Sequence, residues 1–330
     1  MSDAAELEDL RASFRAVLDD AVAAGVVRTH VNEGAVRCEP LWSKAAELGW
    51  FALLTPEAHG GLGLGREAAA VLYEELGRVV APLPMLGALA ATDVIAAYGD
   101  EALQTEWLPR LAGGEGAGID CDGDLIDGAT ASLLLYTTDG GCTLVAADDA
   151  EVGFVELMDR TRTLAKASFP EGGARRVQAA QASRDVLAHA RIAIACDSIG
   201  GAIGILDITV AYLKTREQFG KPIGSFQALK HRCAEHKVAV EAARALVREA
   251  VRRWASNDAD AEFYALVAKQ QACAAYATVA MDAVQLHGGI GFTWEHVCHL
   301  YLKRAKLNQA LFGTTAACRD AAAALLARAA

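Results

Sequence analysis

Two short segments in the last third of the chain carry residues suited to binding a phosphorylated ligand. The first is Arg-Glu-Gln-Phe-Gly-Lys-Pro-Ile at residues 216–223. A guanidinium can hold phosphate oxygens through two parallel hydrogen bonds, and an aromatic ring packs on a flat base or ribose. Arg216, Gln218 and Phe219 are therefore candidate ligand contacts. An isolated Arg-x-x-Phe motif, however, is more often a Gly/Pro turn with a capping arginine.

The second segment is Gln-Leu-His-Gly-Gly-Ile-Gly-Phe at residues 285–292. Without side chains, Gly288 and Gly289 let backbone amides approach a pyrophosphate. The N-terminus of a helix that we expect from Thr293 would favour the negative charge. A glycine cluster alone is often only a helix C-cap. Gln285 and the two glycines gain weight because they follow the first motif.

Long helical patterns must position these two turns. Residues 191–214, 226–255, 259–287 and 293–311 form amphipathic segments with short connections, typical of an antiparallel four-helix bundle. The region before residue 116 is also helical in pattern. Between residues 117 and 180 the helical period disappears, and the runs 132–137 and 142–147 are predicted as strands.

This pattern predicts a mainly α protein with a short β domain. We expect an N-terminal helical domain at 1–116, an abbreviated β domain at 117–180 and a C-terminal four-helix bundle at 181–330. No internal repeat and no long low-complexity linker interrupts the three.

Charge and composition exclude several classes of function. The net charge of -11 opposes binding to nucleic-acid backbones. Polar residues interrupt every apolar run, so no transmembrane helix is expected, and the acidic start lacks the features of a signal peptide. The 8 cysteines show no Cys-x-x-Cys and no zinc-finger spacing, so neither a disulfide scaffold nor a metal site is predicted. These observations favour a cytoplasmic protein.

A local basic run, Lys-Arg-Ala-Lys at residues 303–306, permits two interpretations. It can be a solvated helix face, which is the commoner explanation, or it can meet the phosphates of a small ligand.

Taken together and in this order, the segments at 216–223 and 285–292 resemble the flavin-binding signatures of the acyl-CoA dehydrogenase family. Glu-Leu-Gly-Trp at 47–50 and Glu-Glu-Leu-Gly-Arg at 74–78 resemble the family's N-terminal domain. The resemblance covers nearly the whole chain and is weakest in the middle. It implies FAD as cofactor, an acyl-CoA substrate, and a cofactor shared between subunits.

On this resemblance, Arg216, Gln218 and Phe219 would contact the adenosine diphosphate half of a neighbouring subunit's FAD. Gln285, Gly288 and Gly289 belong to the second cofactor motif. Arg191 matches an arginine that faces the acyl-CoA site, so it could hold a CoA or merely pair with a carboxylate.

The chain departs from the family at the catalytic base. Relatives carry a glutamate just before a Gly-Thr pair, whereas Phe312 stands there and cannot take a proton. Some relatives place the glutamate just before the arginine that matches Arg191, but here His189 and Ala190 stand there. An imidazole such as His189 could act as a base, although on a helix face it is more often structural. The Thr-Glu-Pro...Gly-Ser-Asp stretch that lines the flavin ring is also missing.

The resemblance thus implies a non-catalytic subunit that pairs with a larger catalytic subunit in a heterotetramer. It resembles the small subunits of actinobacterial α2β2 enzymes that desaturate steroid side-chain CoA thioesters. Two alternatives stay open: a self-sufficient homo-oligomeric dehydrogenase with an unconventional base, and a structural subunit that binds no cofactor.

Overall fold

The computed structural model describes residues 4–170 and 174–329. Its first part consists of helices that pack around a large apolar core shared with the rest of the chain. These helices are α1 (Ala4–Ala23), α2 (Val26–Glu33), α3 (Glu39–Glu47), α4 (Gly65–Arg78), α5 (Leu86–Tyr98) and α6 (Glu101–Ala112).

The middle part is a mixed sheet with the strand order β5-β6-β2-β1-β3-β4-β7. Strands β1 and β3 are parallel, and the other neighbours are antiparallel. A two-residue turn, Asp122-Gly123, joins β1 directly to β2, and both turn residues have positive φ (57° and 88°). The strands are β1 (Gly116–Cys121), β2 (Asp124–Ile126), β3 (Ala131–Thr138), β4 (Gly141–Ala146), β5 (Glu151–Val155), β6 (Leu164–Ser168) and β7 (Ala174–Val177).

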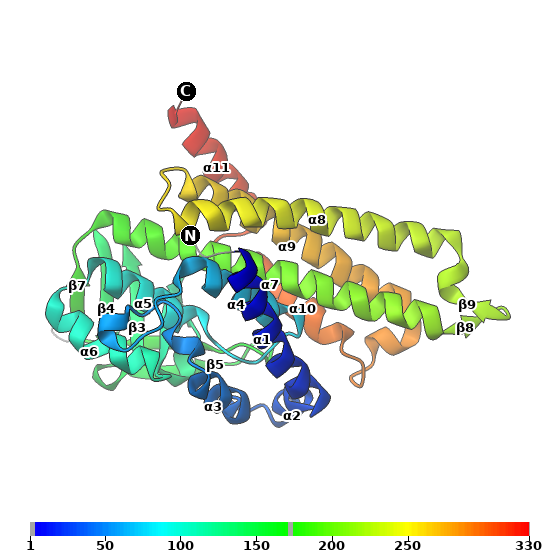
Figure 1. Ribbon diagram of the computed structural model, residues 1–330, viewed down its shortest axis with the longest axis horizontal. Coiled ribbons are helices and arrows are strands. Elements are labelled where there is room, and N and C mark those ends of the chain that lie inside the picture. Colours follow the sequence, from blue (N-terminus) through cyan, green and yellow to red (C-terminus); the bar gives the residue numbers. More distant parts are fainter. Residues whose placement is uncertain (1–3, 171–173, 330) are drawn as a thin grey trace.

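The last part is again helical, and its long helices lie side by side along the molecule (Figure 1). A small hairpin extends from one end of this bundle, whereas the seven-stranded sheet lies at the other end. The elements are α7 (Ala180–Thr215), the hairpin β8 (Glu217–Gln218) and β9 (Lys221–Pro222), α8 (Gln227–Ala255), α9 (Ala261–His287), the 3-10 turn η7 (Gly288–Phe292), α10 (Cys298–Ala310) and α11 (Thr315–Ala329).

Helix α7 is the central helix of the fold. By length and composition it could cross a membrane, but 83% of its most apolar window is buried inside the fold. Glycines let α4 approach it closely: a Cβ at Gly200 would lie 1.8 Å from the carbonyl oxygen of Glu74, and one at Gly204 would lie 2.0 Å from that of Arg78. Its apolar composition is therefore explained by packing in the protein core.

The predicted fold class is confirmed, but two helix starts were predicted wrongly and one helix was not predicted. Helix α7 begins at Ala180, not near Arg191: its first turns mix alanines with polar residues, but Ala182 and Val186 in them already pack into the core. The predicted helix from Thr293 begins only at Cys298, because a 3-10 turn and a loop come first. The alanine-rich end forms one more helix, α11, beyond the four predicted. We keep the division at residues 116 and 180 as a proposal.

Candidate functional site

The first motif lies on the hairpin at the far end of α7. Arg216 is the C-cap residue of α7, and its carbonyl oxygen accepts a hydrogen bond from Ile223 N at 2.8 Å, which closes the hairpin. Its side chain is exposed and has no ion-pair partner among the residues that the structure describes. Gln218 is also exposed, and its side-chain amide donates to the carbonyl oxygen of Glu217 at 2.8 Å. The guanidinium is therefore available to an external ligand.

The hairpin turn presents Phe219 to solvent. Phe219 and Gly220 both have positive φ, 54° and 75°, as a two-residue turn of this hairpin type requires. Such a φ is uncommon for an aromatic residue. The ring is 89% exposed, and its nearest ring neighbour is Phe226, edge-on at 6.1 Å. A large exposed ring in an unfavourable conformation suggests a contact outside the chain.

The second motif lies at the same end of the bundle. Gly288 ends α9 with φ 64° and ψ -142°, a conformation that favours glycine. A Cβ at Gly288 or Gly289 would meet no atom within 4 Å, so this backbone is open to an approaching ligand. Gln285 is exposed one turn earlier. The helix N-terminus that we expected at Thr293 lies further along the chain, because α10 starts at Cys298 and not directly after the glycines.

A contact between α7 and α9 joins the two motifs. Tyr212, one turn before Arg216, stacks on His287 at 4.5 Å, and its hydroxyl donates to the carbonyl oxygen of His287 at 3.3 Å. From the N-terminal part, the Arg28 guanidinium donates to the carbonyl oxygens of Trp294 and Glu295, which fixes the loop after the glycines. The structure thus brings the two predicted ligand motifs to one end of the bundle.

Phe312 lies far from that end, in a turn that other parts of the chain hold in place. It is buried and has φ 54°. Its N–H donates to Cys121 Sγ at 3.1 Å, and its carbonyl oxygen accepts from Arg191 Nε at 3.4 Å. The next carbonyl, of Gly313, accepts from Lys269 Nζ at 2.7 Å. Burial raises the pKa of the Cys121 thiol to about 11, so this thiol remains protonated near neutral pH.

Two cations at this turn lack a carboxylate partner. Neither Arg191 nor Lys269 forms an ion pair with any residue that the structure describes, although Lys269 is fully buried. Desolvation lowers the pKa of Arg191, and its guanidinium stays charged because an arginine does not deprotonate in proteins. The structure thus brings Arg191 and Phe312 together, and no carboxylate among residues 4–170 and 174–329 hydrogen-bonds to this turn.

The side chain of His189 faces α4 and α5, not the Phe312 turn. Its Nε2 hydrogen-bonds with the Tyr73 hydroxyl at 2.9 Å, and its Nδ1 with Asp93 Oδ2 at 3.1 Å. Asp93 in turn pairs with Arg66. The ring is 1% exposed, and desolvation lowers its pKa, so the imidazole is neutral and fully hydrogen-bonded. These contacts assign His189 to the packing between α7 and the N-terminal helices.

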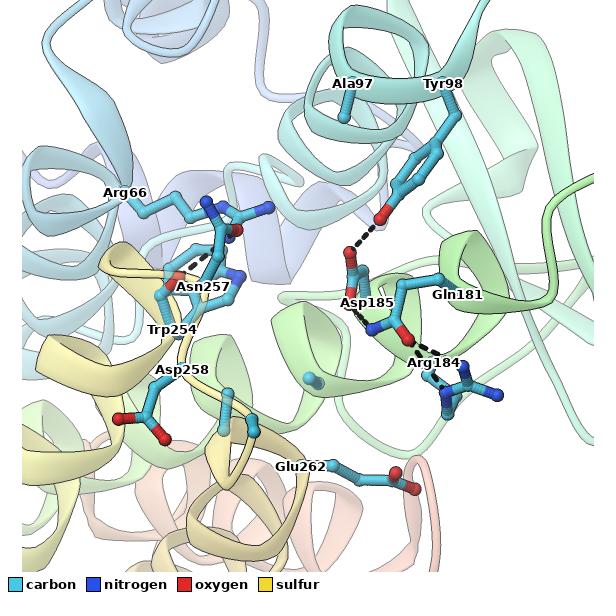
Figure 2. A pocket seen from close by; sticks show the side chains of 13 residues that line it. Arg66, Ala97, Tyr98, Gln181, Arg184, Asp185, Trp254, Asn257, Asp258 and Glu262 are labelled. Atoms are coloured by element: carbon cyan, nitrogen blue, oxygen red, sulfur yellow. Dashed lines mark hydrogen bonds between the residues drawn. The ribbon is translucent and has the colours of Figure 1, made fainter.

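A separate cavity of about 550 Å³ lies at the N-terminal end of α7 (Figure 2). Its walls come from the start of α4, the end of α5, the start of α7 and the connection between α8 and α9. In it, the Tyr98 hydroxyl donates to Asp185 at 2.6 Å, and Arg184 donates to Gln181. Neither Arg191 nor Phe312 lines this cavity. No local sequence pattern could predict this cavity, because its residues come from four distant segments.

The residues of the basic run at 303–306 do not share one role, so neither predicted interpretation holds for the whole run. Arg304 is fully buried, with its Nε 2.8 Å from Asp159 Oδ2 and its Nη1 2.7 Å from Asp197 Oδ1. Lys306 on the same helix is exposed. A structural ion-pair network therefore explains the arginine, and only its neighbours belong to a solvated face.

Comparison with known proteins agrees with this architecture. Residues 4–115 match the N-terminal domain of acyl-CoA dehydrogenases, and residues 180–326 match their C-terminal domain. Acyl-CoA dehydrogenase IpdE2 of Mycobacterium tuberculosis is 38% identical over 295 residues, which cover 86% of this chain and 88% of the relative. The chain belongs to the acyl-CoA dehydrogenase family. It is thus related to oxidoreductases.

One further relative and two solved structures extend the comparison. IpdE2 of Mycolicibacterium smegmatis is 38% identical over 311 residues, covering 91% of this chain and 94% of the relative. Among solved structures, the Tcur3481-Tcur3483 steroid ACAD superimposes with a TM-score of 0.89 at 30% identity, covering 98% of both chains. The ChsE4-ChsE5 complex from Mycobacterium tuberculosis has a TM-score of 0.88 at 24% identity, covering 99% of this chain and 98% of that one, and shows the shared fold.

Proposed function

We propose that this chain is the non-catalytic subunit of a cytoplasmic, FAD-dependent acyl-CoA dehydrogenase that introduces an α,β double bond into an acyl-CoA thioester. Its partner would be a larger catalytic subunit, in a heterotetramer. The observation that carries the proposal is Phe312, a buried aromatic side chain where the family places its catalytic glutamate. No acid or imidazole among the described residues hydrogen-bonds to the Phe312-Gly313 turn.

The residues at the hairpin end fit the diphosphate half of FAD. The exposed Arg216 guanidinium offers two parallel donors, and Gly288 and Gly289 leave an open backbone surface. The flavin ring fits this chain poorly. Strand β1 passes through a two-residue turn directly into β2, so the sheet has no place for the ring-lining stretch of the family.

Distance favours a cofactor shared with another subunit. Arg216 lies 25 residues after Arg191 on the same helix, which corresponds to roughly 37 Å along the helix axis. The hairpin also projects away from the chain's own β sheet (Figure 1). A group held by Arg216 would therefore serve a site on a neighbouring chain, and the steroid ACAD similarity supports a partner subunit.

Exposed apolar side chains at the same end support a partner surface. Phe219 is 89% exposed and Phe292 is 79% exposed, and both belong to the segments that carry the ligand motifs. Large exposed aromatic residues of this kind often mark contact with another chain. We propose that the catalytic subunit covers them.

The chemistry divides between the two chains. FAD, when bound, supplies the hydride acceptor at its flavin ring. In this chain, Arg216 would hold the diphosphate, Phe219 would pack against the adenosine, and Gln285 with the two glycines would shape the adjoining surface. Arg191 remains a candidate contact for an acyl-CoA. The proton acceptor would come from the partner.

We expect the chain expressed alone to contain far less than one FAD per chain and to show no acyl-CoA dehydrogenation. The reason is that it lacks both a base and the ring-lining stretch. Co-expression with a larger relative that carries the glutamate should give a yellow, active heteromer. Flavin content from absorbance and turnover with an electron acceptor measure both outcomes. Stoichiometric FAD with turnover in a pure homo-oligomer would instead support the self-sufficient alternative.

Phe312→Glu in the isolated chain is expected to create no dehydrogenase activity. A carboxylate there would face no positioned flavin, and the base contributes only when the reacting atoms are held together. Phe312→Leu serves as a control for the packing effect of removing the ring. Electron-acceptor reduction with added FAD and acyl-CoA is the measurement. Turnover above that of Phe312→Leu would show that the missing base alone had silenced the site.

A further inference from the structure

We propose that a small cavity between α1, α4 and α8 binds a medium-chain aliphatic carboxylate, and that Arg248 holds the carboxylate group. The cavity has a volume of about 210 Å³ and shares no lining residue with the larger cavity of Figure 2. Neither the Phe312 turn nor the hairpin contributes to its walls. The shared-cofactor proposal therefore gives this cavity no role.

Helical spacing gives the cavity its apolar walls. On α8, Val247 and Val251 lie four residues apart and both line it, and Ala70 and Val71 face it from α4. Cys196 of α7, only 2% exposed, also belongs to the walls. Burial raises the pKa of the Cys196 thiol well above its usual range, so the thiol stays protonated. It then behaves as a small apolar group.

An apolar space of this size is unusual inside a protein. Interiors are close-packed, with few voids larger than a water molecule. An engineered apolar cavity of about 150 Å³ stays dry and binds benzene, so 210 Å³ suits an aliphatic chain of roughly six to eight carbons. Wall atoms that face an empty space lose dispersion contacts, which a bound chain would restore.

The rim of the cavity offers one guanidinium to a ligand. Arg248 and Arg252 lie one turn apart on α8, and both are exposed. Arg252 pairs with Glu249 at 2.7 Å. Arg248 forms no hydrogen bond or ion pair with any residue in the described ranges 4–170 and 174–329. Its guanidinium is therefore available to bind a carboxylate through two parallel hydrogen bonds.

The acids at the rim restrict the charge of the ligand. Glu74 accepts from Arg11 at 3.0 Å and from Arg244 at 2.6 Å, so its charge is balanced within the chain. Glu8 and Glu67 add two further carboxylates to the lining. One available guanidinium beside these acids can balance a single negative charge but not a phosphate. The cavity thus favours a monocarboxylate over a phosphorylated ligand such as CoA.

The experiment is isothermal titration calorimetry of the full chain with hexanoate, octanoate, decanoate and dodecanoate. We expect one octanoate per chain. Affinity should rise about fourfold for each added methylene until the cavity is full, and then level off by decanoate. Octan-1-ol and octan-1-amine have the same chain length without the carboxylate. Both should bind roughly tenfold or more weakly than octanoate, because neither can accept the paired hydrogen bonds of the guanidinium.

Two variants test the two parts of the site. Arg248→Ala, at an exposed position, should lower octanoate affinity roughly tenfold or more and leave the affinity for octan-1-ol unchanged. Val251→Phe, at a half-buried position, should fill the cavity and remove binding of both ligands. Lys230→Ala is the control, because it removes an exposed cation of α8 that lies outside the cavity, and it should change neither affinity.

Circular dichroism and thermal unfolding show whether each variant is folded. The proposal is overturned if octanoate does not bind the wild-type chain, or if octan-1-amine binds more tightly than octanoate. Affinity that keeps rising through dodecanoate would also overturn it, because a closed cavity limits chain length. The same holds if folded Arg248→Ala binds octanoate as the wild type does. Since the titration uses the chain alone without flavin, its failure would not affect the shared-cofactor proposal.

Discussion

Replacing Arg216 by alanine is expected to weaken FAD binding by the assembled heteromer roughly tenfold to hundredfold. The exposed guanidinium at the end of α7 would lose its charge-assisted hydrogen bonds to the diphosphate, a loss of about 1.5–3 kcal/mol. Arg216→Lys should restore only part of the affinity, because an ammonium keeps the charge but not the planar fork. The stability of the chain should hardly change, because the side chain makes no ion pair within the described structure.

The measurement is FAD release from the co-purified complex on dilution, followed by flavin fluorescence. Arg184→Ala is a matched control: it removes an exposed arginine from the first turns of the same helix, at the opposite end from the hairpin. It should leave FAD affinity unchanged. If Arg216→Ala also leaves affinity unchanged while the complex stays intact, Arg216 only ends a helix. The structural-subunit alternative would then gain its main support.

Much of the fold follows from local sequence signals. The long amphipathic segments identify α7, α8 and α9. The Asp-Gly and Gly-Gly pairs mark the turns that separate strands β1 to β4. The errors fall where local signals conflict with tertiary contacts. The segment at 293–297 has helical composition, but hydrogen bonds from Arg28 to two of its carbonyls hold it as a loop. Those bonds join residues more than 260 positions apart, which no local pattern can predict.

Only the short linear motifs of the candidate site could be predicted from the sequence. Phe312 was identifiable because it interrupts a short linear pattern. Its surroundings were not, since Cys121, Arg191 and Lys269 meet that turn from three separate elements. A lone lysine inside an apolar helical stretch is the one available signal for a buried cation, and it is weak because lysines usually reach solvent.

The hairpin and the Phe312 turn are connected by the rigidity of α7. A subunit that offers a cofactor contact at one end must hold that end in a fixed place relative to its own sheet. Hydrogen bonds to Asp197 on α7 hold this end in place. Asp197 accepts from Arg304 and Asn308 on α10 and from Arg162, which lies between β5 and β6. The network joins the bundle to the β region with buried charges.

Arg304→Ala is therefore expected to destabilise the chain by about 3–5 kcal/mol, which corresponds to a fall in melting temperature on the order of 10 °C. The cause is not the loss of an attractive pair alone. Asp159 and Asp197 are each 2% exposed; Asp159 would lose its ion-pair partner, and Asp197 would keep only the pair with Arg162. Lys306→Ala, an exposed cation on the same helix, should change stability by no more than about 0.5 kcal/mol.

A second substitution distinguishes uncompensated charge from lost packing. Arg304→Met keeps much of the buried volume but removes the positive charge, so it should remain destabilising because the ion pairs to Asp159 and Asp197 are lost. Adding Asp159→Asn removes a buried carboxylate that has lost its cation, and it should restore part of the lost stability. Thermal unfolding of the single and double variants gives the coupling between the two positions. Additive effects would contradict the charge explanation, because the two side chains are in direct contact at 2.8 Å and neutralising one alters the cost of losing the other.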